Sequence, residues 1–280
     1  MVFLSYEEPL GAALVVITMF GSLQAAGVLI IFIRFRKTPL VKANNQNLSF
    51  LLLVSLLFCF LCSLFFIGHP NKVTCRLRQA VFGITFALSL SCVLAKTIIV
   101  VIAFSATKPN THRKRWMGPQ LTYMTVTLCT LVQVIICTAW ITVSSPHPEN
   151  NYNLQPGQIV IECNEGSTVA FWCMLGYMGL LGNICFVVAF LARNLPDIFN
   201  EAKYITFSMV IFVSVWFAFI PAYLSTKGKY MVAVEIFAII MSSLGLLVCI
   251  FFPKGYIIIL TPDINTKYYL CNNEQILKRR

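Results

Sequence analysis

Charge is scarce in this sequence, and negative charge is scarcer still. Only 11% of its 280 residues are Asp, Glu, Lys or Arg, and only 10 are acidic. Soluble domains usually carry about 25% charged residues, so an ordinary soluble protein is excluded. The two aspartates are Asp197 and Asp263, and no His-Glu-x-x-His or Cys/His cluster occurs. These absences argue against an enzyme and against a zinc site, so we expect no catalytic residue, metal or cofactor.

Internal repeats, low-complexity tracts and long linkers are also lacking, so residues 1–280 are expected to form one domain. What the chain has instead is long apolar runs, with 58% hydrophobic residues. A helix needs about 20 mostly apolar residues to cross a bilayer. Seven segments reach that length: 10–33, 47–67, 75–104, 120–143, 168–192, 202–224 and 230–252. The sequence therefore predicts an all-α membrane protein, a bundle of seven transmembrane helices with 253–280 as a cytosolic tail.

The basic residues predict the orientation of this bundle. If the amino terminus is outside, most of the 21 Lys and Arg residues fall in inner segments, as is usual for membrane proteins. The first apolar run lacks the basic lead and cleavage site of a signal peptide, so we interpret it as the first membrane helix. We interpret the net charge of +11 as a topology signal, with contact to membrane lipid as a further option, and not as a nucleic-acid surface.

Most of the 11 cysteines lie in the predicted helices, where they usually behave as small apolar residues. Cys271 falls in the predicted cytosolic tail, where palmitoylation and a free thiol both remain open. Cys75 and Cys163 both fall on the oxidising outer side and have no competing partner there. We predict a disulfide between them, which would tether the outer loop 144–167 to the third helix.

Ionisable side chains within a membrane span cost about 2.5–3.5 kcal/mol at mid-helix, so each needs an explanation. Lys96 lies toward the inner end of the third predicted helix, and Glu201 begins the sixth at a similar depth. They could form an ion pair that holds these helices together in a resting state. Equally, Lys96 could extend to lipid headgroups while Glu201 stabilises a helix amino terminus. Position alone leaves both interpretations open.

Glu235 lies about one turn inside the outer end of the seventh predicted helix. It either faces a water-filled mouth, where it would contact a cationic ligand, or pairs with Lys227 or Lys229; position favours the pairing. Trp216 belongs to an aromatic run in the sixth helix, which spacing alone assigns to packing. Pro221 is expected to kink or end that helix near the outer face.

Two inner segments resemble class C G-protein-coupled receptors. Residues 199–203 read F-N-E-A-K, a hallmark of the third inner loop of that class, and 251–256 resemble its F-x-P-K-C-Y motif with Gly255 in place of Cys. The resemblance covers essentially the whole chain. Further strings look most like the vomeronasal type-2 receptors and their fish olfactory relatives, with the calcium-sensing receptor a close cousin: 38–45, 66–72, 163–167 and 224–230.

The resemblance implies a chemosensory receptor of the plasma membrane that signals through a heterotrimeric G protein and works as a homo- or heterodimer. It implies that Lys96 and Glu201 form an inner lock, that Trp216 lines an allosteric cavity, and that Glu235 contacts cationic modulators. It also implies a G-protein contact surface made of Arg113, Lys114, Arg115, Trp116, Met117, Asn200 and Lys203.

Such receptors normally carry an extracellular module that senses the ligand, here expected to be a pheromone or odorant of amino-acid or peptide type. That module is absent from these residues, so we expect a fragment or short form that retains the signalling half. A calcium-sensing-like or amino-acid-taste class C receptor remains an alternative, as does a polytopic transporter or channel. A transporter would favour internal repeats or interrupted helices, and the sequence shows no repeat. The rhodopsin-like D/E-R-Y and N-P-x-x-Y motifs, and a retinal-binding Lys in the seventh helix, are also missing.

Overall fold

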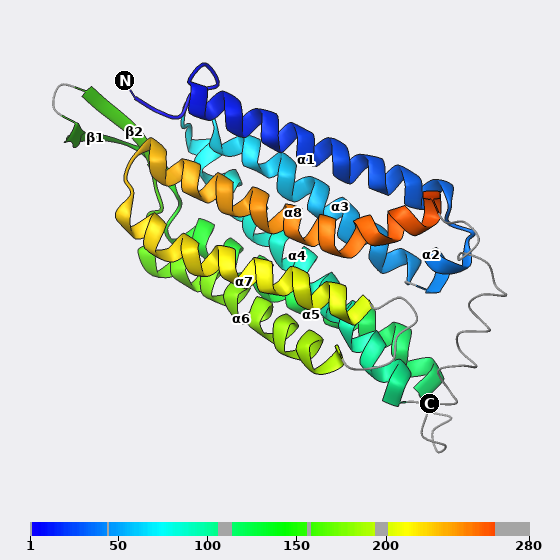
Figure 1. The fold of residues 1–280 in the computed structure, drawn as a ribbon. Helices are drawn as coiled ribbons and strands as arrows, with labels where there is room; N and C mark the ends of the chain where they lie inside the picture. Colours follow the sequence, from blue (N-terminus) through cyan, green and yellow to red (C-terminus); the bar gives the residue numbers. More distant parts are fainter. Residues whose placement is uncertain (1, 44, 106–113, 156–157, 194–200, 261–280) are drawn as a thin grey trace.

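The polypeptide folds into a bundle of long helices that lie side by side (Figure 1). A computed structural model describes residues 2–43, 45–105, 114–155, 158–193 and 201–260. Within these ranges, seven helices are long and apolar enough to cross a membrane. The predicted all-α class and the seven spans are confirmed.

The helices follow the apolar runs of the sequence, with short elements between them. The long helices are α1 (Pro9–Arg34), α3 (Gln46–Cys62), α4 (Lys72–Ser105), α5 (Lys114–Val143), α6 (Thr168–Ala192), α7 (Glu201–Ser225) and α8 (Lys229–Leu260). The short elements are the helix α2 (Pro39–Ala43), the 3-10 turn η1 (Ser63–Phe66) and the strands β1 (His147–Gln155) and β2 (Gln158–Asn164).

The helix ends differ from the prediction mainly where proline occurs. Pro221 lies inside α7, which continues to Ser225, so it does not end the helix. Pro253 lies inside α8, which continues to Leu260 well past the predicted end at residue 252. A proline removes one backbone donor, and packed neighbouring helices allow membrane helices to tolerate that loss. The helical part of the chain therefore extends into the predicted tail.

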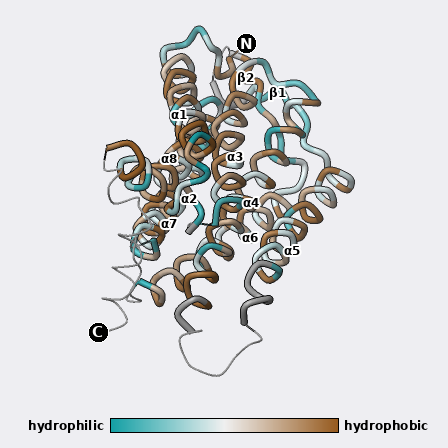
Figure 2. The backbone as a smooth tube through the Cα atoms, turned by 90° about the vertical axis from the view of Figure 1, so that its right-hand side faces the viewer, coloured by the Kyte–Doolittle hydropathy of each residue, from teal (hydrophilic) through white to brown (hydrophobic). Residues whose placement is uncertain are grey.

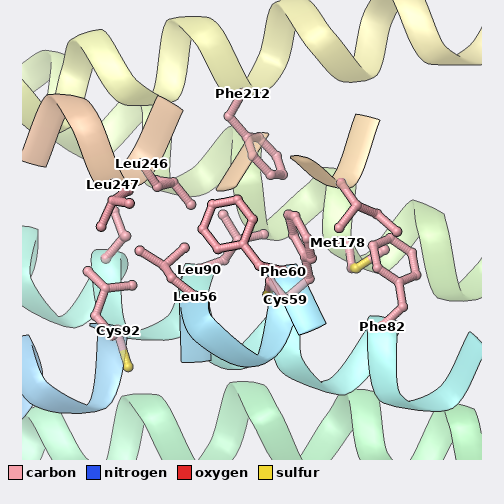
Figure 3. Close-up of a cluster of buried hydrophobic side chains, with 14 of the residues drawn as sticks. Leu56, Cys59, Phe60, Phe82, Leu90, Cys92, Met178, Phe212, Leu246 and Leu247 are labelled. Carbon is pink, nitrogen blue, oxygen red and sulfur yellow. The ribbon is translucent and has the colours of Figure 1, made fainter. Parts of the chain in front are cut away.

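The core runs along the middle of the bundle, between α4 and α8. In the apolar membrane-crossing stretch of each of these two helices, 61% of the residues are buried, whereas only 22% are buried in that of α5. Figure 3 shows side chains from five helices meeting there: Leu56, Leu90, Met178, Phe212 and Leu246. Small residues allow helices to approach closely. At Gly21 of α1, for example, an added Cβ would lie only 2.6 Å from the Phe60 ring of α3.

The outward faces of the helices are apolar, as lipid contact requires. Val16, Leu23, Leu128 and Phe217 are all more than half exposed. The tube in Figure 2 carries mostly hydrophobic colours along the long helices. This distribution, apolar both inside and outside, is that of a multi-pass membrane protein.

The outer loop forms a β-hairpin that the sequence did not predict. β1 and β2 pair antiparallel, with Glu149 opposite Glu162 in the register. Val2 adds to this hairpin, because its N–H donates to the Ile159 carbonyl (2.8 Å) and its carbonyl accepts from Ile161 N–H (3.0 Å). The amino terminus and the hairpin consequently lie at the same end of the bundle (Figure 1).

Candidate functional site

One buried carboxylate joins three helices at the inner end of the bundle. Glu201, the first residue of α7, receives the Lys96 ammonium of α4 at 3.3 Å. The Lys254 ammonium of α8 reaches the same carboxylate oxygen at 2.6 Å. The side chains of both lysines are 2% exposed and that of Glu201 is 11% exposed. This group, with Ser49 of α3, is named the inner ion cluster below.

Ser49 extends the inner ion cluster to a fourth helix, because its hydroxyl oxygen accepts from Lys96 Nζ at 2.9 Å. Lys96 therefore points into the bundle, and the interpretation that it extends to lipid headgroups is wrong. Removing one partner from a buried ion pair typically costs about 3–5 kcal/mol, because the other charge stays buried without compensation. The cluster thus makes the inner ends of α3, α4, α7 and α8 dependent on one another.

Lys254 is the member of the inner ion cluster that sequence reasoning missed. The predicted seventh helix ended at residue 252, which assigned Lys254 to the tail. Lys254 belongs to the motif at 251–256 that resembles F-x-P-K-C-Y. It could be assigned to the bundle only by continuing the helix through Pro253. Once α8 continues, Lys254 occupies a buried helical position facing α7.

A small cavity with aromatic walls lies toward the outer end of the bundle, and its volume of about 10 Å³ is roughly what one water molecule needs. Its lining residues come from η1, α4, α6, α7 and α8: Phe66, Gln79, Phe82, Phe171, Leu175, Trp216, Phe219, Glu235 and Ile239. The Trp216 ring stacks on Phe82, with centroids 5.9 Å apart, and packs edge-on against Phe219. Trp216 and Glu235, which the resemblance assigned to one cavity, both line this space.

The cavity has a polar end formed by α4 and α8. Gln79 Nε2 donates to Glu235 Oε1 at 3.5 Å. The guanidinium of the adjacent Arg78 lies over the Phe66 ring and is close enough to Glu235 for their charges to interact. Among the described residues, Glu235 Oε2, Arg78 Nε and Trp216 Nε1 are buried without a hydrogen-bond partner. Such atoms favour a polar ligand group or water at this end of the cavity.

The predicted pairing of Glu235 with Lys227 or Lys229 is wrong. Lys229 instead contacts the Glu8 carboxylate at 3.1 Å, tying the outer ends of α8 and α1 together. No ion pair joins Lys227 to Glu235 among the described residues. The physical reason is helical geometry: side chains three or four positions apart share a helix face, and the spacing from 229 to 235 does not fit.

The hairpin is fastened to the bundle beside this cavity. The predicted disulfide is present and joins Cys75 of α4 to Cys163 of β2. The Glu165 carboxylate accepts from the Tyr223 hydroxyl of α7, and the Glu165 carbonyl accepts from Trp140 Nε1 of α5 at 2.9 Å. Three membrane helices therefore hold the outer loop in place, and Glu165 and Tyr223 carry no signal in the sequence that would have revealed this role.

The predicted G-protein contact residues are only partly described. Lys203 is exposed near the inner end of α7. Lys114, Arg115, Trp116 and Met117 begin α5, but their side chains lie outside the description, as do Arg113 and Asn200 altogether.

Comparison with known proteins gives a consistent result across most of the chain. Residues 4–254 match the family described as "7 transmembrane sweet-taste receptor of 3 GCPR". Vomeronasal type-2 receptor 26 of Mus musculus is 54% identical over 260 residues, covering 93% of this chain and 30% of that receptor. The extracellular calcium-sensing receptor of Homo sapiens is 51% identical over 264 residues, covering 94% of this chain and 24% of that receptor. The chain therefore spans less than a third of the length of these two relatives.

Proposed function

Because the chain belongs to the class C family of seven-transmembrane G-protein-coupled receptors, we propose that it is the signalling core of a chemosensory receptor that activates a heterotrimeric G protein. The similarity to vomeronasal type-2 receptors supports the chemosensory assignment. In this proposal the protein binds a ligand, changes conformation and catalyses no reaction. It works as a homo- or heterodimer in the plasma membrane. The inner ion cluster is the observation that carries the proposal.

The inner ion cluster suits a two-state switch. A single carboxylate on α7 holds lysines on α4 and α8, so a small displacement of α7 breaks both contacts together. In the resting packing these contacts close the inner end of the bundle. In the active packing Glu201 leaves the two lysines, and the inner loops become available to the G protein. A ligand acts by binding one packing more tightly than the other.

The outer cavity lies beside the same helix, and a ligand larger than water binds there only in a packing in which the cavity walls move apart. Trp216 lines the cavity and Glu201 belongs to the inner ion cluster, and both are on α7. At about 1.5 Å per residue they are roughly 22 Å apart along the helix. Because α7 is one continuous helix, a ligand that shifts Trp216 also moves Glu201. Aromatic walls and the Glu235 carboxylate favour an apolar molecule that carries a cationic group.

A second candidate is a receptor that responds to calcium, supported by the 51% identity to calcium-sensing receptors of several mammals. Both candidates activate a G protein, so one assay, nucleotide exchange, reports on either. They are separated by comparing the exchange that calcium stimulates with the exchange that apolar amines stimulate. A calcium-dependent change in exchange would favour the second candidate.

The test is nucleotide exchange on a panel of purified G proteins, with the full chain in nanodiscs. Lys96→Glu or Glu201→Lys alone should raise basal exchange by about 5- to 10-fold, the effect of a bias of about 1–1.4 kcal/mol on a two-state equilibrium. Because Lys254 contacts position 201 directly, the rescue needs all three charges reversed: Lys96→Glu with Glu201→Lys and Lys254→Glu again places one charge between two opposite ones and should return exchange toward the original level. Lys72→Glu, an exposed change at the outer end of α4, is the matched control.

Each outcome of this test is informative. If the single variants changed exchange but the full reversal of all three charges did not recover it, the inner ion cluster would stabilise the fold without acting as a switch. If neither the original chain nor any variant stimulated a G protein in the panel, the proposed signalling function would be wrong for this chain.

A further inference from the structure

The inner end of α1 and the turn that follows it form an exposed basic surface. Arg34, Arg36, Lys37 and Lys42 are all exposed. The sequence contains no Asp or Glu between Glu8 and Glu149, so this part of the chain offers no acidic neighbour. None of the four basic residues forms an ion pair with a described acidic side chain. These four residues are named the α1 basic platform below.

The platform is held rigidly. The Phe35 N–H donates to the Ile31 carbonyl at 2.9 Å, and both the N–H and the hydroxyl of Thr38 donate to the Phe35 carbonyl. Leu40 and Val41 of α2 are completely buried, which anchors the short helix in the bundle. The backbone is therefore fixed, and the basic side chains project outward from it at a low cost in ordering the loop.

Apolar residues directly beside the platform place it at the edge of the hydrocarbon. Ile30 is 65% exposed, Ile33 is 50% exposed and Phe35 is 39% exposed. α1 packs mainly against α3 and α8, and it forms one edge of the bundle in Figure 1. Its free face therefore points to lipid, and the change from exposed Ile33 to Arg34, Arg36 and Lys37 falls where headgroups begin.

We propose that the α1 basic platform binds the phosphate-bearing headgroups of anionic phospholipids in the inner leaflet. Juxtamembrane Lys and Arg residues are attracted to anionic lipid, each by a factor of roughly five in affinity. The two arginines can also hold a phosphate through paired N–H donors. The neighbouring Ile33 and Phe35 contact the acyl chains of the same lipids.

An acidic surface of the G protein is the competing partner for a basic inner surface. The lipid is favoured because the platform adjoins lipid-facing apolar residues on α1, whereas the inner ion cluster lies on α3, α4, α7 and α8. Lipid binding at α1 does not depend on signalling, so this inference stands or falls separately from the proposed function.

The experiment uses the full chain in detergent, with phosphatidylserine or phosphatidylcholine of equal acyl chains added and the retained lipid counted by native mass spectrometry. The original protein should retain phosphatidylserine in clear preference. A triple variant, Arg34→Gln with Arg36→Gln and Lys37→Gln, should lower this preference by more than about tenfold. The matched control, Lys72→Gln with Arg76→Gln and Lys227→Gln, removes the same charge from exposed outer positions and should stay within about twofold of the original.

Three results would overturn the inference: an unchanged preference in the folded triple variant, an equal loss in the control, or displacement of the lipid by inorganic phosphate at the same concentration. Arg34→Lys with Arg36→Lys should keep most of the preference, and single Gln variants replace the triple variant if it does not fold. Nucleotide exchange in phosphatidylcholine nanodiscs then distinguishes a lipid-binding surface from a G-protein-binding surface. If the triple variant lost exchange there while keeping its lipid preference, the platform would be a G-protein surface and the lipid assignment would be wrong.

Discussion

Individual charged residues carry most of the functional information in this protein, because few of them lie within the helices. Lys96 and Glu235 stood out in the sequence for that reason, and each proves to contact polar partners on other helices. Lys254 and Arg78 were missed because they fall near the ends of the predicted helices, where a basic residue is ordinary. Only the packed structure separates a buried terminal residue from an exposed one.

Glu201 is the residue whose loss should be most damaging. Glu201→Gln leaves Lys96 and Lys254 buried beside a neutral amide, so we expect a loss of about 3–5 kcal/mol in the free energy of unfolding. Thermal unfolding in detergent would show this as a lower midpoint. Glu149→Gln, an exposed change in β1, serves as the control and should shift the midpoint little. Equal midpoints for both variants would mean that the inner ion cluster adds no net stability.

Among the elements, the helices could be predicted from sequence and the hairpin could not. An apolar run of about 20 residues leaves the backbone little choice other than a helix in lipid. The loop 144–167 has no such constraint, and its pairing depends on contacts distant in sequence: the disulfide to Cys75 and the hydrogen bonds to Val2. The same reasoning explains the extension of α8, since helix packing around Pro253 is also a long-range effect.

The disulfide should matter more to the hairpin than to the helices. It is the covalent cross-link between β2 and α4, whereas α4 and α6 also hold each other by extensive packing along their length. With Cys75→Ser and Cys163→Ser together, we expect faster hydrogen exchange in β2 and at Val2, with little change in α6. Cys173→Ser, which alters an exposed free thiol, is the control. Uniformly faster exchange throughout the bundle would show instead that the disulfide stabilises the whole fold.

At the scale of the whole molecule, burial separates two kinds of apolar residue that the sequence cannot distinguish. Hydropathy is nearly uniform along each span and hides which face of the helix is inside. The sequence therefore predicts seven helices but not which helices pack against one another. The structure shows that α4 and α8 are central and α5 is peripheral. The cavity and the inner ion cluster depend on this arrangement, which is why their composition could not be worked out from spacing alone.

This difference predicts unequal effects of the same substitution. Leu56→Ala removes a fully buried side chain from α3 and should cost about 2–5 kcal/mol, because it leaves a cavity in the core. Leu128→Ala changes a lipid-facing side chain of α5 that is 65% exposed and should cost well under half as much. Thermal unfolding of the two variants in the same detergent measures the difference. Comparable losses would contradict the assigned positions of α3 and α5.

The attachment of Val2 to the hairpin has a mechanical consequence. Two backbone hydrogen bonds join Val2 to β2 on either side of Val160. Tension applied at the amino terminus along the strand loads both bonds together, whereas tension across it opens them one after the other. The force then passes through β2 and the Cys75–Cys163 bond into α4, the helix that carries Lys96 near its far end. The attachment of the amino terminus thus resists a pull along the strand better than a pull across it, and the resisted pull is carried to the helix that holds Lys96.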